Sequence, residues 1–206
     1  EWVIENKEKY NITIINLSVS SAVDDPDGTS PVSREANKAV EYGLIVVAAA
    51  GNEGPDAETL DAPAVADKVI AVAAIDDLNT IDRTDDTIAE YSSRGPRKDG
   101  AKKPDISAPG SDIIGALAAE TGQASDGLVR MWGTSMAAPH VTGVCALILQ
   151  ANPNLSPLEV KEILLDTAED KGEGGWDANY GWGEIDAYKA ITLAVNGNLD
   201  GGSHSS

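Results

Sequence analysis

Ser135 lies in the most informative stretch of the sequence, the octapeptide GTSMAAPH from Gly133 to His140. A glycine precedes this serine and a long apolar segment follows it, which predicts a turn that leads into a helix. The first turn of a helix has backbone N–H groups without partners in the helix and the positive end of the helix dipole. These groups can hold the oxyanion that forms when a hydroxyl attacks a carbonyl, so Ser135 is a candidate nucleophile. The alternative role is that of a helix N-cap, which serine also favours.

Asn52 is the candidate for a second donor to such an oxyanion. The segment before it, LIVVAAA at 44–50, is apolar throughout and predicts a buried strand. Asn52 therefore follows the carboxyl end of a strand, which is where open α/β sheets build their sites. Its side-chain amide could face developing negative charge without competing for the proton. The alternative is a turn asparagine in left-handed geometry.

Neither histidine of the chain is well placed to act as a general base for Ser135. His140 follows five residues later, and five helical steps of about 100° turn it roughly 140° away from Ser135. His204 belongs to the C-terminal sequence GGSHSS, which is typical of a frayed tail. The residues therefore predict a nucleophile and hydrogen-bond donors for an oxyanion, but no general base to accept the proton of the nucleophile.

Five segments resemble those of the subtilisin-like serine proteases, the subtilases. GTSMAAPHVTG resembles the nucleophile motif of this family, and VVAAAGNEG resembles its oxyanion-hole motif. SSRGP, KPDISAPG and YGWGEIDAYKA, at 92–96, 103–110 and 180–190, also occur in the family's order. The resemblance extends from the first helix to about Ala194. It implies a serine endopeptidase that forms an acyl-enzyme on Ser135, with Asn52 as the oxyanion donor.

The resemblance also implies that two triad members lie outside this chain. In subtilases the triad runs Asp, His, Ser along the sequence, and the Asp and His motifs precede the region that corresponds to Glu1. We therefore expect the C-terminal part of a catalytic domain, which needs a partner segment bearing Asp and His. Loss of the histidine is known in this family to cost on the order of 10⁶ in turnover, so we expect this chain to be inactive alone.

The expected substrate is a protein or peptide bound in an extended conformation. Ser18, Val19 and Ser20 resemble the subtilase strand that pairs with substrate through backbone hydrogen bonds. The family usually has glycine where Ser20 stands, which leaves the width of the cleft open, and a simple strand end is the alternative. Three small residues would line one wall of the first specificity pocket and leave room for a large apolar side chain: Ala49, Ala50 and Gly51.

The order of the expected elements is typical of an α/β fold with a mostly parallel sheet. The resemblance implies the three-layer subtilisin-like architecture, present here as its C-terminal portion. We expect strands over 12–18, 44–50, 69–74 and 113–117, and helices over 2–9, 31–42, 136–150, from 156 onward and over 186–195. These elements form one domain over 1–195, followed by a polar, disordered tail over 196–206.

The central helix at 136–150 is apolar on all its faces, which predicts burial all round. Pro139 lacks the N–H that would bond the Ser135 carbonyl, so we expect a bend near the start of this helix. Ser156, Pro157 and Glu159 have the spacing of a capping box and predict the start of the next helix.

Composition excludes several functional classes. A length of 206 residues with 42% hydrophobic residues is enough for one folded domain. The net charge of −19 argues against nucleic acid as a partner, and no apolar run is long enough to span a membrane. The single cysteine, Cys145, cannot form an internal disulfide and is interpreted as a buried small hydrophobe.

We expect no cofactor for the chemistry and an extracellular setting, although the chain shows no targeting segment of its own. The acidic loop at 24–28, DDPDG, could bind structural calcium, because calcium prefers clustered oxygen ligands. The loop lacks the EF-hand spacing, so a solvated loop is the favoured interpretation.

Two other hypotheses compete with the protease. The chain could be a non-catalytic module that binds peptides or proteins, or a proteolytic piece without a separate role. The missing base supports the binding module, whereas the presence of both Ser135 and Asn52 argues against it. A domain without its front strands would expose a sheet edge, so we expect it to associate with the missing piece, to dimerise or to be marginally stable.

Overall fold

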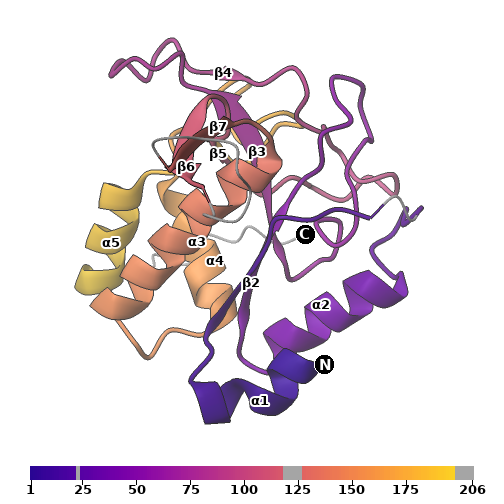
Figure 1. Ribbon diagram of the computed structural model, residues 1–206, viewed down its shortest axis with the longest axis vertical. Helices are drawn as coiled ribbons and strands as arrows, with labels where there is room; N and C mark the ends of the chain where they lie inside the picture. Colours follow the sequence, from indigo (N-terminus) through magenta and orange to yellow (C-terminus); the bar gives the residue numbers. More distant parts are fainter. Residues whose placement is uncertain (22–23, 118–126, 198–206) are drawn as a thin grey trace.

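A mostly parallel sheet with helices on both faces forms the framework of the computed structural model, which describes residues 1–21, 24–117 and 127–197 (Figure 1). Strand β2 (Ile45–Ala49) pairs in parallel with β1 (Ile14–Leu17) on one side and with β3 (Ile70–Asp76) on the other. Strand β5 (Ile106–Pro109) continues the parallel order beside β3, and the short β4 (Thr87–Ile88) pairs antiparallel with the end of β3. The predicted α/β class is confirmed.

The two faces of the sheet bury different sets of side chains. Because side chains alternate along a strand, Ile45, Val47 and Ala49 of β2 face one layer, and Val46 and Ala48 face the other. Helices α3 (Thr134–Ala151), α4 (Pro157–Thr167) and α5 (Ala187–Asn196) cover the first face. Helices α1 (Trp2–Tyr10) and α2 (Pro31–Glu41) cover the second, which completes the three layers.

Local sequence signals set the helix boundaries. Ser156 accepts a hydrogen bond from the Glu159 N–H while the Glu159 carboxylate accepts from the Ser156 N–H, so the predicted capping box is confirmed. Asp186 caps α5 in a similar way. Helix α5 ends at Asn196, one residue later than expected, and Gly197 in left-handed geometry is its C-cap. Residues 198–206, including His204, lie outside the described part.

Strand β1 has a free edge. It pairs with β2 alone among the described residues, and its side chains are half-buried or exposed, whereas every residue of β2 is buried. The expectation of a buried first strand is therefore wrong for this chain. An unpaired strand edge is available for pairing with a further strand.

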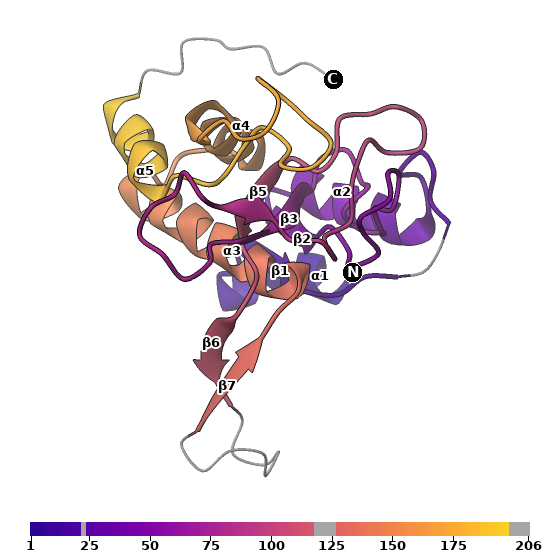
Figure 2. The ribbon, with the colours of Figure 1, turned by 90° about the horizontal axis from the view of Figure 1, so that it is seen from above.

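Two further expectations need correction. Residues 113–117 do form a strand, β6 (Ile113–Ala116), but it pairs with β7 (Leu128–Met131) in a separate hairpin that projects from the body (Figure 2). Helix α3 is not buried all round, because His140, Gly143 and Leu147 on its outer face are exposed. None of the described helices is long and apolar enough to cross a membrane.

Candidate active site

Ser135 is the second residue of α3, where the chain turns from the hairpin into the helix. Gly133 precedes the helix with φ 141°, a conformation that glycine adopts readily and other residues avoid. The Gly133 N–H donates to Gly110 O at 2.9 Å, and the Met136 N–H donates to Gly133 O at 2.9 Å. The half-buried Ser135 side chain is thereby held at the amino end of the helix, as the sequence predicts.

Ser18 contacts Ser135 through two reciprocal hydrogen bonds. The Ser18 hydroxyl donates to the Ser135 carbonyl at 2.8 Å, and the Ser135 hydroxyl donates to the Ser18 carbonyl at 3.1 Å. The Ser135 carbonyl needs this donor because Pro139, one turn later, has no N–H. The bond missing from the helix is thus supplied by the segment just beyond β1.

Asn52 follows β2, and its side chain is oriented by Thr134. The Asn52 Oδ1 accepts from the Thr134 N–H at 2.9 Å and lies 3.1 Å from the buried Thr134 hydroxyl. That hydroxyl also accepts from the Gly51 N–H at 3.2 Å. With Oδ1 engaged by these donors, Nδ2 is the atom of the amide that is left to donate to a ligand.

The Asn52 amide and the Ser135 N–H border the same small space beside Gly133. A Cβ built on Gly133 would lie 3.6 Å from Asn52 Nδ2 and 3.7 Å from the Ser135 N. None of the hydrogen bonds among the described residues uses the Ser135 N–H. Both donor nitrogens therefore lie near Gly133, at the turn just before Ser135, and a pair of donors at such a place is what an oxyanion requires.

Two residues from other segments fix the turn that carries Asn52 and the turn before Ser135. Ser93 donates its N–H to Gly51 O at 2.9 Å and accepts from the Glu53 N–H at 3.1 Å through its hydroxyl. The Tyr91 hydroxyl donates to Gly110 O at 2.9 Å and accepts from the Gly133 N–H at 3.2 Å. Sequence reasoning did not assign these positions, although Ser93 belongs to the SSRGP segment.

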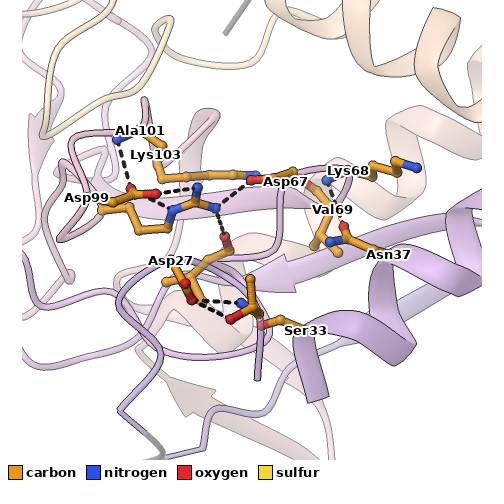
Figure 3. Close-up of polar contacts among 12 residues, drawn as sticks. Asp27, Ser33, Asn37, Asp67, Lys68, Val69, Asp99, Ala101 and Lys103 are labelled. Carbon is orange, nitrogen blue, oxygen red and sulfur yellow. Dashed lines mark hydrogen bonds and ion pairs between the residues drawn. The ribbon is translucent and has the colours of Figure 1, made fainter. Parts of the chain in front are cut away.

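The KPDISAPG segment contributes a buried ion pair and a strand that were not predicted. Lys103 donates to Asp105 Oδ2 at 2.7 Å and to Val69 O at 2.7 Å, and burial lowers the pKa of Lys103 to about 7. Asp105 Oδ2 also accepts from the Ala71 N–H at 2.7 Å. Figure 3 labels Lys103 and Val69, two members of this cluster. The cluster fastens β5 to β3 and lies apart from Ser135.

His140 and Ser135 are not hydrogen-bonded to each other. The His140 Nδ1 lies 2.8 Å from Met136 O, while the Ser135 hydroxyl donates to Ser18 O. The helical spacing predicts that the two side chains diverge, yet both border a cavity of about 380 Å³ between α3 and the β6–β7 hairpin. Ser135 can reach this cavity because it lies at the very tip of the helix.

The remaining predicted substrate and metal residues are distributed as follows. Val19 is exposed beyond β1, while Ala49, Ala50 and Gly51 are buried at the end of β2.

In the acidic loop, Asp25 accepts from the Ser30 N–H at 2.9 Å, and Asp24 pairs with Lys98 at 2.6 Å. Among the described residues, no three His, Cys, Asp or Glu side chains are grouped so that they could hold a metal ion, and calcium binding by this loop stays a prediction.

Comparisons with known proteins match most of the chain. Residues 1–183 match the family described as the subtilase family. Serine protease AprX of Bacillus subtilis (strain 168) is 40% identical over 204 residues, covering 93% of this chain and 46% of that protein. Subtilisin DY of Bacillus licheniformis is 33% identical over 192 residues, covering 92% and 59%. The solved structure of sphericase has a TM-score of 0.73 at 31% identity, covering 89% and 60%. The chain thus spans about half the length of these curated relatives.

Proposed function

This chain belongs to the subtilase family, and from this membership we propose that it forms the nucleophile-bearing part of a serine endopeptidase. Its substrates are proteins or peptides, hydrolysed through an acyl-enzyme on Ser135. The observation that supports this role most directly is that the Asn52 amide nitrogen and the Ser135 backbone nitrogen both lie near Gly133, at the turn that leads to the Ser135 hydroxyl.

In the proposed mechanism, the Ser135 hydroxyl attacks the scissile carbonyl and its proton passes to a histidine. The carbonyl oxygen becomes an oxyanion, which accepts hydrogen bonds from Asn52 Nδ2 and the Ser135 N–H. The tetrahedral intermediate collapses, the peptide C–N bond breaks, and the histidine gives its proton to the leaving amine, which leaves the acyl-enzyme on Ser135. Water then attacks the acyl-enzyme and passes a proton to the histidine, which returns it to the Ser135 oxygen as the acid product leaves. The peptide lies extended between the segment at 18–20 and the end of β2 at 49–51, and pairs with the former through its backbone.

The histidine and its orienting aspartate come from a segment outside this chain. Three surfaces of the described part support such a partner: the free edge of β1, the exposed outer face of α3 and the cavity between α3 and the hairpin. The cavity has apolar walls from Ile113, Val129 and Met131. A histidine that enters beside Ser135 replaces the Ser18 carbonyl as the acceptor of its hydroxyl proton, and without it the chain is inactive.

The proposal also covers the cofactor, the partners and the location of this activity. We assign no metal or organic cofactor to the chemistry, since the nucleophile and both oxyanion donors are protein groups. The net charge of −19 disfavours nucleic acid as a partner. Action outside the cell on extended peptides is the working hypothesis.

Complementation of peptide hydrolysis tests the proposal. The chain would be assayed alone and together with a polypeptide that contains the Asp- and His-bearing region of the same source protein. We expect cleavage with both parts present, no measurable cleavage by either part alone, and none with Ser135→Ala. The substitution Thr192→Ala, at an exposed position of α5, serves as a control that should retain activity. Peptide binding without cleavage in the reassembled protein would instead favour the non-catalytic module.

A further inference from the structure

A cavity of about 550 Å³ lies beside the segment that carries Asn52. Three of its lining residues adjoin the candidate site: Ser20, Glu53 and Asp61. Ser20 follows the segment that contacts Ser135, and Glu53 is the neighbour of Asn52 in the chain. The volume is within the range of pockets that accept a side chain or a small ligand.

Asp61 is held against the backbone that leads to Asn52. Its N–H donates to Ala50 O at 3.1 Å. Its Oδ2 lies 3.0 Å from the position that a Cβ on Gly51 would occupy, so the carboxylate packs directly against this glycine. A substrate carbonyl between Asn52 and the Ser135 N–H belongs to the residue before the scissile bond. The side chain of that residue branches from the Cα that is bonded to the carbonyl carbon, and can therefore extend along Gly51 into the cavity.

The negative charge of Asp61 is not neutralised within the described part of the chain. None of the ion pairs between described residues involves Asp61 or Glu53. Burial raises the pKa of the Asp61 carboxyl, a hydrogen bond from Ser20 opposes this shift, and the charge of Glu53 adds to it. A half-buried carboxylate of this kind gains most from a cation that enters the cavity with a substrate.

The cationic side chains that also line this cavity are already paired. Arg97 donates to Asp67 at 2.5 Å, to Asp99 at 2.8 Å and to Val65 O at 2.6 Å. Figure 3 shows Asp67 and Asp99 on either side of these contacts. Lys98 is paired with Asp24 at 2.6 Å. These two cations are therefore not available to neutralise Asp61.

We propose that Asp61 selects a basic side chain, lysine or arginine, at the substrate residue that precedes the scissile bond. This inference rests on the proposed protease function and revises the expectation of a large apolar side chain. That expectation came from the small residues at 49–51, which do not line this cavity. The carboxylate of Asp61 does line the cavity, and the contact of a guanidinium or ammonium with it gives specificity as well as affinity.

The test uses the assembled protease and a set of peptides that differ only at the residue before the scissile bond. That residue would be arginine, lysine, phenylalanine, leucine or glutamate. We expect the highest kcat/KM for arginine and lysine and the lowest for glutamate. With Asp61→Asn, kcat/KM for the basic peptides should fall about 10- to 100-fold, as expected for the loss of a charged hydrogen bond, while the phenylalanine peptide changes little.

Asp56→Asn is the matched control, because it removes a carboxylate from the same loop outside the cavity lining. It should leave the ratio of arginine to phenylalanine cleavage unchanged. The ratio is the decisive readout, since a purely structural defect lowers cleavage of all peptides together. Faster cleavage after phenylalanine or leucine by the unmodified protein would overturn the inference but leave the protease function standing. Absence of cleavage of every peptide would overturn both.

Discussion

Ser18 and Ser135, which are 117 residues apart in the sequence, exchange two hydrogen bonds, hydroxyl to carbonyl in each direction. The pair joins the end of β1 to the first turn of α3. It exists because Pro139 removes the amide that would otherwise satisfy the Ser135 carbonyl. The same contact places the nucleophile against the segment that we assign to substrate pairing.

Removing the Ser18 hydroxyl should destabilise the protein. Ser18→Ala leaves the Ser135 carbonyl without its side-chain donor, and we expect a loss of about 1–2 kcal/mol in the free energy of unfolding, measured with urea. In a Pro139→Ala background an amide becomes available to that carbonyl, so the same substitution should cost less. Equal costs in the two backgrounds would show that the hydrogen bond is not the source of the effect.

Asn52→Ala should lower turnover of the assembled protease with little change in KM. The oxyanion develops only after attack, so the lost hydrogen bond affects the transition state more than the bound substrate. The reduction already known for loss of such a donor in this family is about 10²–10³ in kcat. Thr134→Val should give a smaller loss in the same direction, because it removes only the hydroxyl that helps to orient Asn52. Steady-state kinetics would check both, with the exposed Asn154→Ala as the control. A rise in KM at constant kcat would speak against the oxyanion role.

Glu184 should make stability depend on pH in a defined direction. Burial, helped by a hydrogen bond with Asp86, raises the pKa of Glu184 from its usual 4.5 to about 7. Between these values the folded protein retains a proton that the unfolded chain has released. The contribution of Glu184 to stability is therefore complete below about pH 4.5 and is lost as the pH rises through about 7.

Urea unfolding of Glu184→Gln across this pH range measures the effect. As the pH rises, the free energy of unfolding of the unmodified protein should fall relative to that of the Glu184→Gln variant. The exposed Glu173→Gln should show the same pH dependence as the unmodified protein. A constant difference between the Glu184 variant and the unmodified protein would contradict the shifted pKa.

Cys145 should be inert to thiol reagents in the folded protein. It is completely buried in α3, and burial raises the pKa of its thiol to about 12. The reactive thiolate is thus scarce and inaccessible. A disulfide reagent at about pH 8 should label the thiol only after urea is added, at a rate that follows unfolding. Rapid stoichiometric labelling without urea would show that the helix opens locally.

Much of the fold could be predicted from local patterns. The apolar run at 44–50 predicted β2, and the helix expected over 31–42 corresponds to α2, which begins at Pro31. Strand β5 was missed, because its four residues lie between prolines and glycines and gain their order from pairing with β3. The hairpin partner β7 was missed because its pairing to β6 joins distant positions that neither segment signals alone.

The residues of the candidate site also fall into two groups, those that the local sequence predicted and those that it did not. Ser135 and Asn52 could be predicted, because each follows directly from its place at the end of an element. Thr134, Ser93 and Asp61 could not, since their importance depends on contacts with residues about 10 to 83 positions away. Asp61 in particular lies in a loop whose sequence shows no pattern, and only the fold brings it to Gly51.

Labelling of Ser135 by a fluorophosphonate tests the central claim most directly, because this reagent requires an activated serine and an oxyanion cradle but no peptide substrate. The account predicts negligible labelling of the isolated chain, rapid labelling at Ser135 once the Asp- and His-bearing segment is bound, and a marked slowing with Asn52→Ala. Fast labelling of Ser135 in the isolated chain would contradict the need for an external base. Absence of labelling in the assembled protein would contradict the role of Ser135 as nucleophile.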